Sequence, residues 1–396
     1  MRIALMTNNY KPIMGGVPIS IERLAKGLKS LGHEVTIFAP TYKEQEEDED
    51  VIRYSTLLNR FIGGIVLPNP FDLRIEKEFQ KKEYDIIHVH HPMLVGRTAV
   101  YLSQKYGIPL VFTYHTRYEK YVESYTCGII KAERLMPFYL HTFLKHCNYV
   151  FAPTEGIRNY LTDICKVSPE KTGILPTGIE ERNYHVPATQ INEIRKKYDA
   201  LNCPLFLTVS RMAQEKNIGF LLESLSEFKK RYGRPFRMLM VGDGPHRKEY
   251  EKECNTLRIR DEVIFTGTIP NEELAAYFGA ADTFLFASKT ETQGIVVLEA
   301  FAGSTPVLAV RASGVEDLVT EGINGMLTEE DKDEYAEMLI NFYKDSFKRS
   351  EMAENAYRTG LTYHEESVAK EAVRVYNEVV TAARTAPIKS GLVRLG

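Results

Sequence analysis

The chain has 396 residues, none of them tryptophan, and it contains only five cysteines. Cys127, Cys147, Cys165, Cys203 and Cys254 are scattered along the sequence and never stand in C-x-x-C spacing. An odd number of scattered cysteines argues against a disulfide framework and against a zinc site, and it is typical of reduced thiols in the cytosol.

Long apolar runs and strong net charge are also missing. No stretch of about 20 apolar residues occurs, so the sequence predicts no transmembrane helix, and any membrane contact is expected to be peripheral. The start, Met1–Met6, leads directly into a strand pattern without the architecture of a signal peptide, which favours a cytoplasmic protein. The net charge of −3 offers no electrostatic reason to expect a nucleic-acid partner. The acidic run 44–50 is expected to be a solvated loop, although Asp48 and Asp50 leave a metal-binding alternative open.

The dinucleotide fingerprint G-x-G-x-x-G is absent. Instead, a turn with Gly15-Gly16-Val17 follows a predicted strand, Arg2–Thr7, and precedes a predicted helix. Such a turn either lets the backbone approach a phosphate or is a generic tight turn. An NAD-dependent oxidoreductase is therefore poorly supported. Tyr101 and Lys105 have the spacing of an epimerase pair, which without the glycine fingerprint we interpret as a chance match.

Strand and helix patterns alternate in two series, which predicts an α/β protein with two doubly wound domains facing each other across a cleft. The first domain is predicted at 1–180 and the second at 181–362, with the polar stretch up to Asn202 as the connection. The predicted strands are Arg2–Thr7, Glu34–Ala39, Asp85–His90, Pro109–Thr113, Asn148–Ala152, Thr172–Pro176, Leu205–Val209, Phe236–Val241, Val263–Thr266, Thr283–Ala287 and Thr305–Val310.

The segment Ser288–Ala302 passes from a buried strand through a glycine, Gly294, into a helix pattern. It carries Glu291 before or at the helix start and Glu299 inside the helix. Ionised carboxylates are strong acceptors for sugar hydroxyls, and backbone N–H groups near Gln293–Ile295 favour an anion. This predicts a polyol joined to phosphate. The alternative is that the two glutamates only start a helix and solvate its face.

A second set of polar residues follows other strands of the second series. Arg211 and Lys216 flank a helix entry, where two fixed cations suit a diphosphate and make a metal unnecessary for neutralising it. The alternative is a solvated charge pair. The turns at Gly242–Pro245 and at Gly267–Pro270 also look ligand-facing.

Histidines lie at the carboxyl ends of two predicted strands of the first series, namely His90, His91 and His115. Ligands gather at the carboxyl ends of parallel strands, so these residues predict contacts with a polar ligand, while a purely structural histidine remains the alternative for each. After His115, the stretch Glu119–Cys147 is predicted to be helical and mixes aromatic with cationic residues. It is compatible with a surface that lies on lipid headgroups and equally with an ordinary pair of core helices.

Taken together and in this order, these motifs resemble the retaining GT-B nucleotide-sugar glycosyltransferases of glycosyltransferase family four. The resemblance extends over nearly the whole chain. It implies that Arg211 and Lys216 bind the donor diphosphate, Glu291 holds hydroxyls of the donor sugar, Glu299 holds the ribose, and Gly16 caps the phosphate. It further implies that His115 contacts the transferring sugar and that a last helix, Tyr363–Thr385, packs back on the first domain. The expected catalytic set is His115, Arg211, Lys216 and Glu291; the donor-binding set is Gly15, Gly16, Gly242, Gly244, Thr268, Thr292, Gln293, Gly294, Ile295 and Glu299; the acceptor-side set is His90, Tyr114, Arg117 and Tyr118.

Within that family, Phe112–Glu119 and Ser288–Gly294 resemble the enzymes that glucosylate diacylglycerol. The resemblance implies an α-glycoside made from a nucleotide sugar such as UDP-glucose, without a required cofactor or metal, at the inner face of the plasma membrane. Transfer to a soluble or polyprenyl-linked acceptor and a non-catalytic sugar-binding protein remain alternatives. The donor base, the hexose and the oligomeric state stay open.

Overall fold

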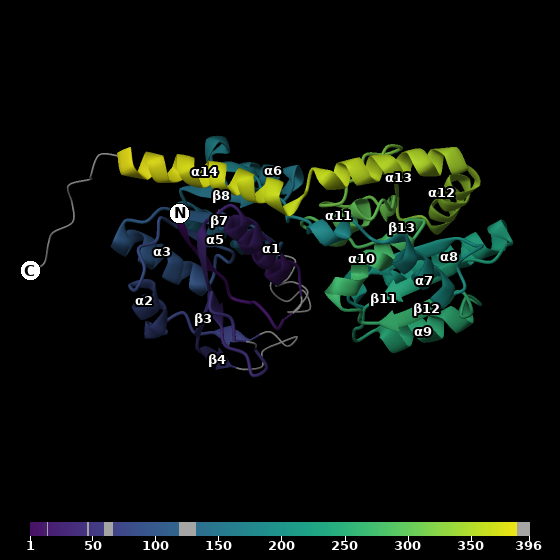
Figure 1. Ribbon diagram of the computed structural model, residues 1–396, viewed down its shortest axis with the longest axis horizontal. Helices are drawn as coiled ribbons and strands as arrows, with labels where there is room; N and C mark the ends of the chain where they lie inside the picture. Colours follow the sequence, from purple (N-terminus) through teal and green to yellow (C-terminus); the bar gives the residue numbers. More distant parts are fainter. Residues whose placement is uncertain (14, 46, 59–65, 119–131, 386–396) are drawn as a thin grey trace, which may run out of the picture.

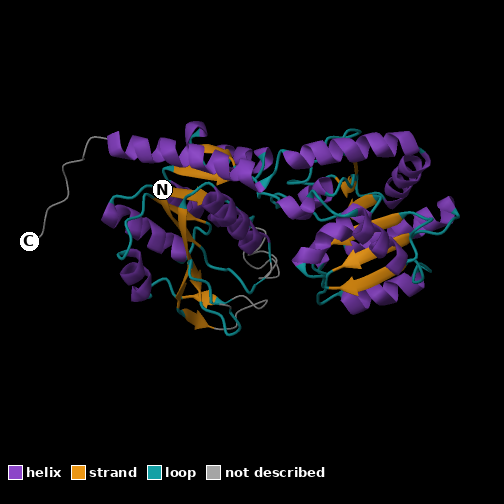
Figure 2. Ribbon diagram, in the orientation of Figure 1, coloured by secondary structure: helices purple, strands orange, loops and turns teal. Residues whose placement is uncertain are grey.

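The computed structural model describes residues 1–13, 15–45, 47–58, 66–118 and 132–385. They form two lobes, each built around a parallel sheet with helices on both faces (Figures 1 and 2). The predicted α/β architecture with two doubly wound halves is therefore confirmed.

The first lobe contains the sheet order β3-β2-β1-β6-β7-β8-β9 among the described residues. Helices α2, α3, α5 and α6 pack into the core on one face of this sheet, and α1 and α14 pack on the other face. The strands are β1 (Arg2–Met6), β2 (Glu34–Pro40), β3 (Val51–Tyr54), β6 (Ile86–Val89), β7 (Leu110–Thr113), β8 (Tyr149–Ala152) and β9 (Thr172–Ile174), with β4 (Thr56–Leu58) and β5 (Leu67–Pro68) paired separately. The helices are α1 (Gly16–Ser30), α2 (Leu73–Phe79), α3 (Val95–Tyr106), α5 (Ala132–Leu144), α6 (Glu155–Asp163) and the short η2 (Pro169–Lys171).

The second lobe has the sheet order β12-β11-β10-β13-β14-β15. Helices α7, α10, α11 and α13 lie on one face and α8, α9 and α12 on the other. The strands are β10 (Leu205–Val209), β11 (Arg237–Val241), β12 (Val263–Gly267), β13 (Thr283–Phe286), β14 (Val307–Val310) and β15 (Gly325–Thr328). The helices are η3 (Glu181–Asn183), α7 (Ala188–Lys197), η4 (Gln214–Lys216), α8 (Ile218–Tyr232), α9 (Arg247–Thr256), α10 (Asn271–Ala280), α11 (Ile295–Ala302), α12 (Lys332–Lys344) and α13 (Ser346–Leu361). The chain continues into α14 (Glu365–Thr385), which belongs to the first lobe.

The last helix, α14, returns to the first lobe and lies along it (Figure 1). The chain crosses between the lobes twice, and the two crossings pair through Ile179 and His364. Helix α14 then packs against α1 so closely that a Cβ at Gly27 would lie 2.8 Å from the Cβ of Ala369. A side chain at residue 27 would therefore push the two helices apart.

Three sequence predictions need correction or completion. The polar stretch before Asn202 is not only a connection, because it contains α7, which packs against α10. Strands β3 and β15 and helices α2 and α13 were not predicted. The predicted helical stretch Glu119–Cys147 lies partly outside the described residues, and its described part is α5. The domain boundary at residue 180 stays a prediction. In the described part of the chain, no helix has the length and apolar character needed to cross a membrane.

Candidate active site in the cleft between the lobes

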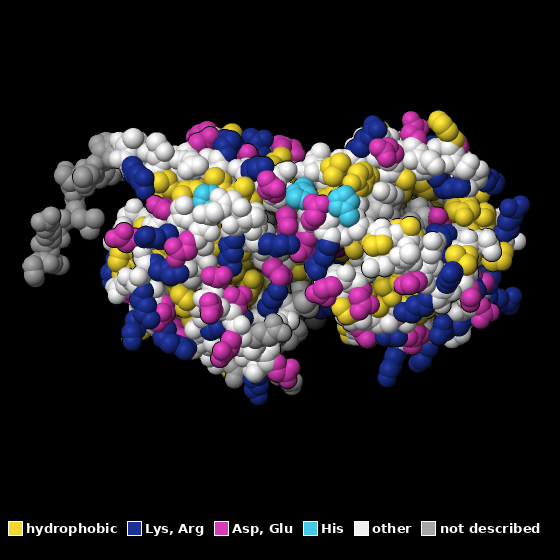
Figure 3. Space-filling view, viewed as in Figure 1, with side chains coloured by type: hydrophobic (Ala, Val, Ile, Leu, Met, Phe, Trp, Pro, Cys, Tyr) yellow, Lys and Arg dark blue, Asp and Glu magenta, His cyan; other side chains and the backbone are white. Residues whose placement is uncertain are grey.

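The carboxyl ends of the central strands of both sheets meet at the junction between the lobes. A direct contact shows this: the Oγ1 of Thr292, after β13, donates to the carbonyl oxygen of His115, after β7, at 2.8 Å. On the face seen in Figure 3, the lobes are separated by an indentation, and cationic and acidic side chains lie along it. The motif that follows β13 and the motif that follows β7 therefore meet at this junction.

Lys216 and Glu291 form an ion pair in this cleft. Lys216 ends η4, Glu291 lies in the loop before α11, and its Oε1 is 2.5 Å from the Lys216 Nζ. Both side chains are about one-fifth exposed, so the pair is partly shielded from water. Burial alone would raise the pKa of Glu291, but the ammonium of Lys216 and the hydroxyl of Ser288 bring that pKa below its ordinary value. Glu291 is therefore an ionised acceptor held beside a cation.

Arg211 is the second cation that the sequence predicted for the diphosphate site. Its guanidinium is 2.7 Å from Glu215, and the side chain is about half exposed. The turn that carries Arg211 packs closely against the glycine turn that follows β11. A Cβ at Gly242 would lie 2.0 Å from the carbonyl oxygen of Ser210, and one at Gly244 would lie 2.4 Å from that of Met212. Gly242 also has φ of 123°, in the region that favours glycine. These glycines thus fix the loop that presents Arg211.

The start of α11 faces the glycine turn of the first lobe. Gly294 adopts φ of 71° and precedes Ile295. A Cβ at Gly16 would lie 3.5 Å from the Ile295 side chain, so the two turns are neighbours across the cleft. Within the described residues, the backbone N–H groups of Gly294 and Ile295 have no hydrogen-bond acceptor. Free N–H groups at a helix start suit an anion.

Two donor-site predictions look different in the structure. Gln293 is 4% exposed, and its Oε1 accepts from the backbone N–H of Thr177. Its side chain therefore binds the segment that crosses between the lobes. Glu299 is also 4% exposed and accepts from the guanidinium of Arg23 on α1. Thr268 is exposed in the turn after β12. The donor-binding roles of these residues remain predictions.

Arg23 is the residue that sequence reasoning missed. It is 2% exposed, and it contacts Glu299, the carbonyl oxygen of Gly178 and, at 3.8 Å, Glu180. A cation so buried needs such partners, because an unpaired buried charge is strongly unfavourable. The available signal in the sequence was that residue 23 shares a helix face with the small residues Ser20 and Gly27, and the structure shows both of these to be buried.

The acceptor-side set is only partly on the surface. Tyr114 is fully buried in the first-lobe core, and His90 is 1% exposed behind His115, because strand-end residues can point into the core. The acceptor-side roles of these two residues stay predictions. Arg117 and Tyr118 are partly exposed, and the Arg117 guanidinium stacks 4.7 Å from the ring centre of Tyr160.

Buried neutral histidines make unfolding of this protein pH-dependent. Burial lowers the pKa of fully buried His88 to about 3, whereas an unfolded histidine has a pKa of about 6.5. The unfolded state therefore binds more protons below pH 6.5, so stability falls as the pH falls from 6.5 towards 3. Over pH 6.5 to 5, His88 accounts for a loss of about 2 kcal/mol.

We expect His88→Gln to reduce the slope of unfolding free energy against pH by nearly one proton near pH 5 and by progressively less towards pH 7. Urea unfolding from pH 5 to 7 measures this slope. His146→Gln, at an exposed position, is the matched control for replacing a histidine. An unchanged slope in His88→Gln contradicts the account.

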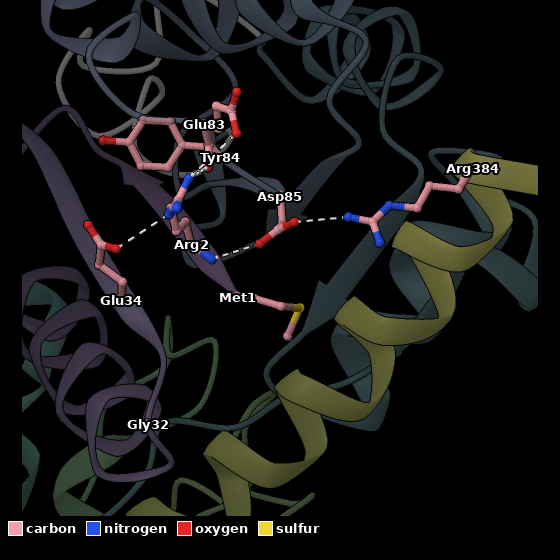
Figure 4. A pocket seen from close by; sticks show the side chains of 8 residues that line it. All are labelled: Met1, Arg2, Gly32, Glu34, Glu83, Tyr84, Asp85 and Arg384. Atoms are coloured by element: carbon pink, nitrogen blue, oxygen red, sulfur yellow. Dashed lines mark hydrogen bonds and ion pairs between the residues drawn. The ribbon is translucent and has the colours of Figure 1, made fainter.

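No group of three or more His, Cys, Asp or Glu is arranged around a possible metal site among the residues that the structure describes. A cavity of about 610 Å³ lies elsewhere, at the amino end of β1 (Figure 4). Its charged side chains are mutually paired, Arg2 with Glu34 and Arg384 with Asp85, and it is remote from the strand ends that carry the motifs. We therefore place the site in the cleft.

Comparison with known proteins identifies the family of the chain. Residues 14–182 match the family described as Glycosyltransferase Family 4, and residues 190–359 match Glycosyl transferases group 1. The alpha-monoglucosyldiacylglycerol synthase of Streptococcus pneumoniae is 33% identical over 336 residues, which is 83% of this chain and 75% of that protein. The synthase of the same name from Acholeplasma laidlawii is 29% identical over 96% of this chain and 98% of its own length.

Among solved structures, Anabaena HepE in complex with UDP superimposes with a TM-score of 0.75 at 19% identity, covering 96% of this chain and all of that chain. A likeness at that identity supports the fold. Two Rossmann-like lobes, matches to both family models and a relative at 33% identity lead to one conclusion. The chain belongs to the GT-B glycosyltransferases of family 4.

Proposed function

We propose that this protein transfers a glucose unit from UDP-glucose to diacylglycerol at a membrane surface and forms an α-glycoside. The ion pair of Lys216 and Glu291, set opposite His115 in the cleft, carries the proposal. The donor and acceptor are supported by the names of the two relatives, both alpha-monoglucosyldiacylglycerol synthases, and by the UDP bound to the similar structure of HepE.

In this proposal the donor diphosphate sits between the lobes. Arg211 and Lys216 neutralise it as negative charge develops on the leaving group, and the free N–H groups at the start of α11 contribute. Because two cations supply that charge, the proposal requires no metal. Glu291, ionised beside Lys216, accepts hydrogen bonds from hydroxyls of the sugar.

We propose that the reaction retains the anomeric configuration. The acceptor hydroxyl attacks from the face that the diphosphate leaves, and the departing phosphate oxygen takes the hydroxyl proton, so no separate general base is needed. Water would compete as an acceptor, and closure of the lobes excludes it. The contacts of Thr292 with His115 and of Arg23 with Glu299 are of the kind that such closure makes.

Product analysis tests this assignment. The purified protein is incubated with UDP-[¹⁴C]glucose and diacylglycerol in mixed micelles or vesicles, with and without EDTA, and the labelled lipid is digested with α- and β-glucosidase. We expect an α-glucosidase-sensitive glycolipid that forms equally in EDTA. A labelled water-soluble product, formed only when soluble acceptors are supplied, favours the other acceptor class. Label in neither contradicts the proposed donor or acceptor.

Exposed apolar side chains on the first lobe offer a surface for a membrane. Phe71, Leu73, Leu135 and Phe138, here called the apolar rim, are 84%, 82%, 69% and 71% exposed. Phe71 and Leu73 lie at the start of α2, and the other two lie in the first half of α5. These helices run antiparallel to the strands, so their starts lie at the cleft end of the sheet.

The two halves of the apolar rim are linked through α3. The hydroxyl of Thr98, in the first turn of α3, donates to the carbonyl oxygen of Pro70, and the neighbouring Arg97 interacts with Tyr139 on α5. Arg97 is exposed. Apolar side chains with a cation among them suit the headgroup region of an anionic bilayer. A lipid acceptor held there would reach the cleft from the bilayer.

We expect Phe138→Asp to weaken binding to anionic vesicles at least fivefold, since it puts a charge where an apolar ring would enter the bilayer. Co-sedimentation with phosphatidylglycerol vesicles at low salt measures this. Phe347→Asp is the matched control, because Phe347 is equally exposed (78%) but lies on α13 of the second lobe. Equal loss in both variants, or binding by neither parent nor variant, counts against the apolar rim.

A further inference from the structure

His90 lies behind His115 and is in hydrogen-bond contact with it. It follows β6, and its Nδ1 is 2.8 Å from the Nε2 of His115. Its ring is stacked between His88, with centroids 4.3 Å apart, and His115, with centroids 5.1 Å apart. His90 is 1% exposed, and its Nε2 is buried without a hydrogen-bond partner.

His88, at the other end of this stack of rings, is held by contacts with two hydroxyl groups. His88 contacts the hydroxyl of Tyr376 on α14 at 2.5 Å through Nδ1, and the hydroxyl of Thr113 on β7 at 2.7 Å through Nε2. With both nitrogens of His88 engaged, its ring cannot rotate freely. The His90 ring is therefore clamped, and its contact with His115 has one geometry.

A single proton lies between His90 and His115. Both rings are neutral near pH 7, because burial holds their pKa values well below the ordinary value of histidine. A neutral imidazole has one N–H donor and one acceptor nitrogen. Either His115 donates from Nε2 or His90 donates from Nδ1.

The two arrangements leave different atoms unpaired. If His115 donates, the His90 proton must sit on Nε2, where it is a buried N–H without an acceptor. If His90 donates, its Nε2 is only an unfilled acceptor. Orphaned buried N–H groups are rare in native proteins, so the second arrangement, which avoids one, is favoured.

We infer that His90 is a positioning residue that holds His115 in the tautomer with its proton on Nδ1. The Nδ1 of His115 is then a hydrogen-bond donor to an oxygen of a bound ligand and not a base. The inference rests on the proposed function only where it takes the ligand to be the donor sugar. The tautomer itself is a property of the free protein.

Long-range ¹H–¹⁵N spectra of the full chain, labelled with ¹⁵N-histidine, test the tautomer without any substrate. We expect His90 and His115 to be protonated on Nδ1. His91 is the internal standard for the opposite tautomer, because its Nδ1 accepts from the backbone N–H of Asn8 at 3.1 Å and its proton must be on Nε2. His115 protonated on Nε2 in the parent overturns the inference.

Two variants then separate positioning from packing. In His90→Asn the side-chain amide N–H replaces the Nδ1 donor, whereas His90→Leu removes it. We expect the Leu variant to show mixed His115 tautomers and at least tenfold lower kcat, with the KM for UDP-glucose within twofold, while the Asn variant keeps the parent tautomer and a kcat within threefold. Equal losses in both, or an unchanged His115 tautomer in the Leu variant, overturn the positioning role. If UDP-glucose is not a donor, only the kinetic arm is lost, and the spectra still decide.

Discussion

Lys216→Ala is expected to lower kcat/KM for UDP-glucose by roughly 100-fold or more, which corresponds to about 3 kcal/mol of lost transition-state stabilisation. Two effects add. The variant removes a cation from the proposed diphosphate site, and it leaves the Glu291 carboxylate, one-fifth exposed, without its counter-charge. The pKa of Glu291 then rises, since burial is no longer offset by the Lys216 ammonium.

Steady-state kinetics and calorimetric titration with UDP measure this variant. We expect UDP binding to weaken together with turnover, because a diphosphate contact is lost in both states. Lys230→Ala is the matched control: Lys230 pairs with Glu227 on the same helix as a surface ion pair and is 63% exposed. Parent-like turnover by Lys216→Ala would remove Lys216 from the site.

Glu291→Ala is expected to lower turnover by a similar factor, roughly 100-fold, but for a different reason. In the proposal Glu291 contacts hydroxyls of the sugar and not the nucleotide. We therefore expect affinity for UDP to stay within a few-fold of the parent while transfer is lost. Glu291→Gln, which keeps the shape but not the charge, should recover only part of the activity, because a carboxylate is the stronger acceptor for hydroxyls.

The same titration separates the two variants. A Glu291→Ala protein that loses UDP affinity as strongly as Lys216→Ala would show that Glu291 acts by holding Lys216 rather than by binding sugar. Glu227→Ala serves as the control on the surface pair. Near-normal transfer by Glu291→Ala contradicts the assignment.

Local pattern was sufficient for the central strands of both sheets. Leu205–Val209 was predicted with the bounds that β10 has, because an apolar run between polar turns has few alternatives in a buried parallel sheet. Helix α7 was missed for the opposite reason. Its sequence is polar, and no side chain in it is fully buried, so it lacks the apolar stripe that marks a helix.

The sequence could locate the candidate site only to the ends of the predicted strands. Strand ends placed Arg211, Lys216 and Glu291 at one edge, and the structure brings the last two into contact. Which way a side chain points at such an edge is decided by tertiary packing. His90 and Tyr114 therefore point inward, although the sequence suggested only that they lie at strand ends.

Contacts between the lobes were beyond the reach of local pattern. The partner of Arg23, Glu299, is 276 residues away in the chain, and the Thr292 contact with His115 spans 177 residues. The packing role of Gly242 was likewise not predicted. The sequence suggested a turn that faces the ligand, and the structure adds that a Cβ there would collide with the turn that carries Arg211.

The central claim, a nucleotide diphosphate held by cations in the cleft, is tested most directly by thermal unfolding of the purified protein with UDP, GDP or ADP, each with and without EDTA. A ligand that binds only the native state raises Tm. We predict a rise with UDP that persists in EDTA and is lost in Lys216→Ala but kept in Lys230→Ala. No rise with any nucleotide, or a rise that the Lys216 variant retains in full, would contradict the claim.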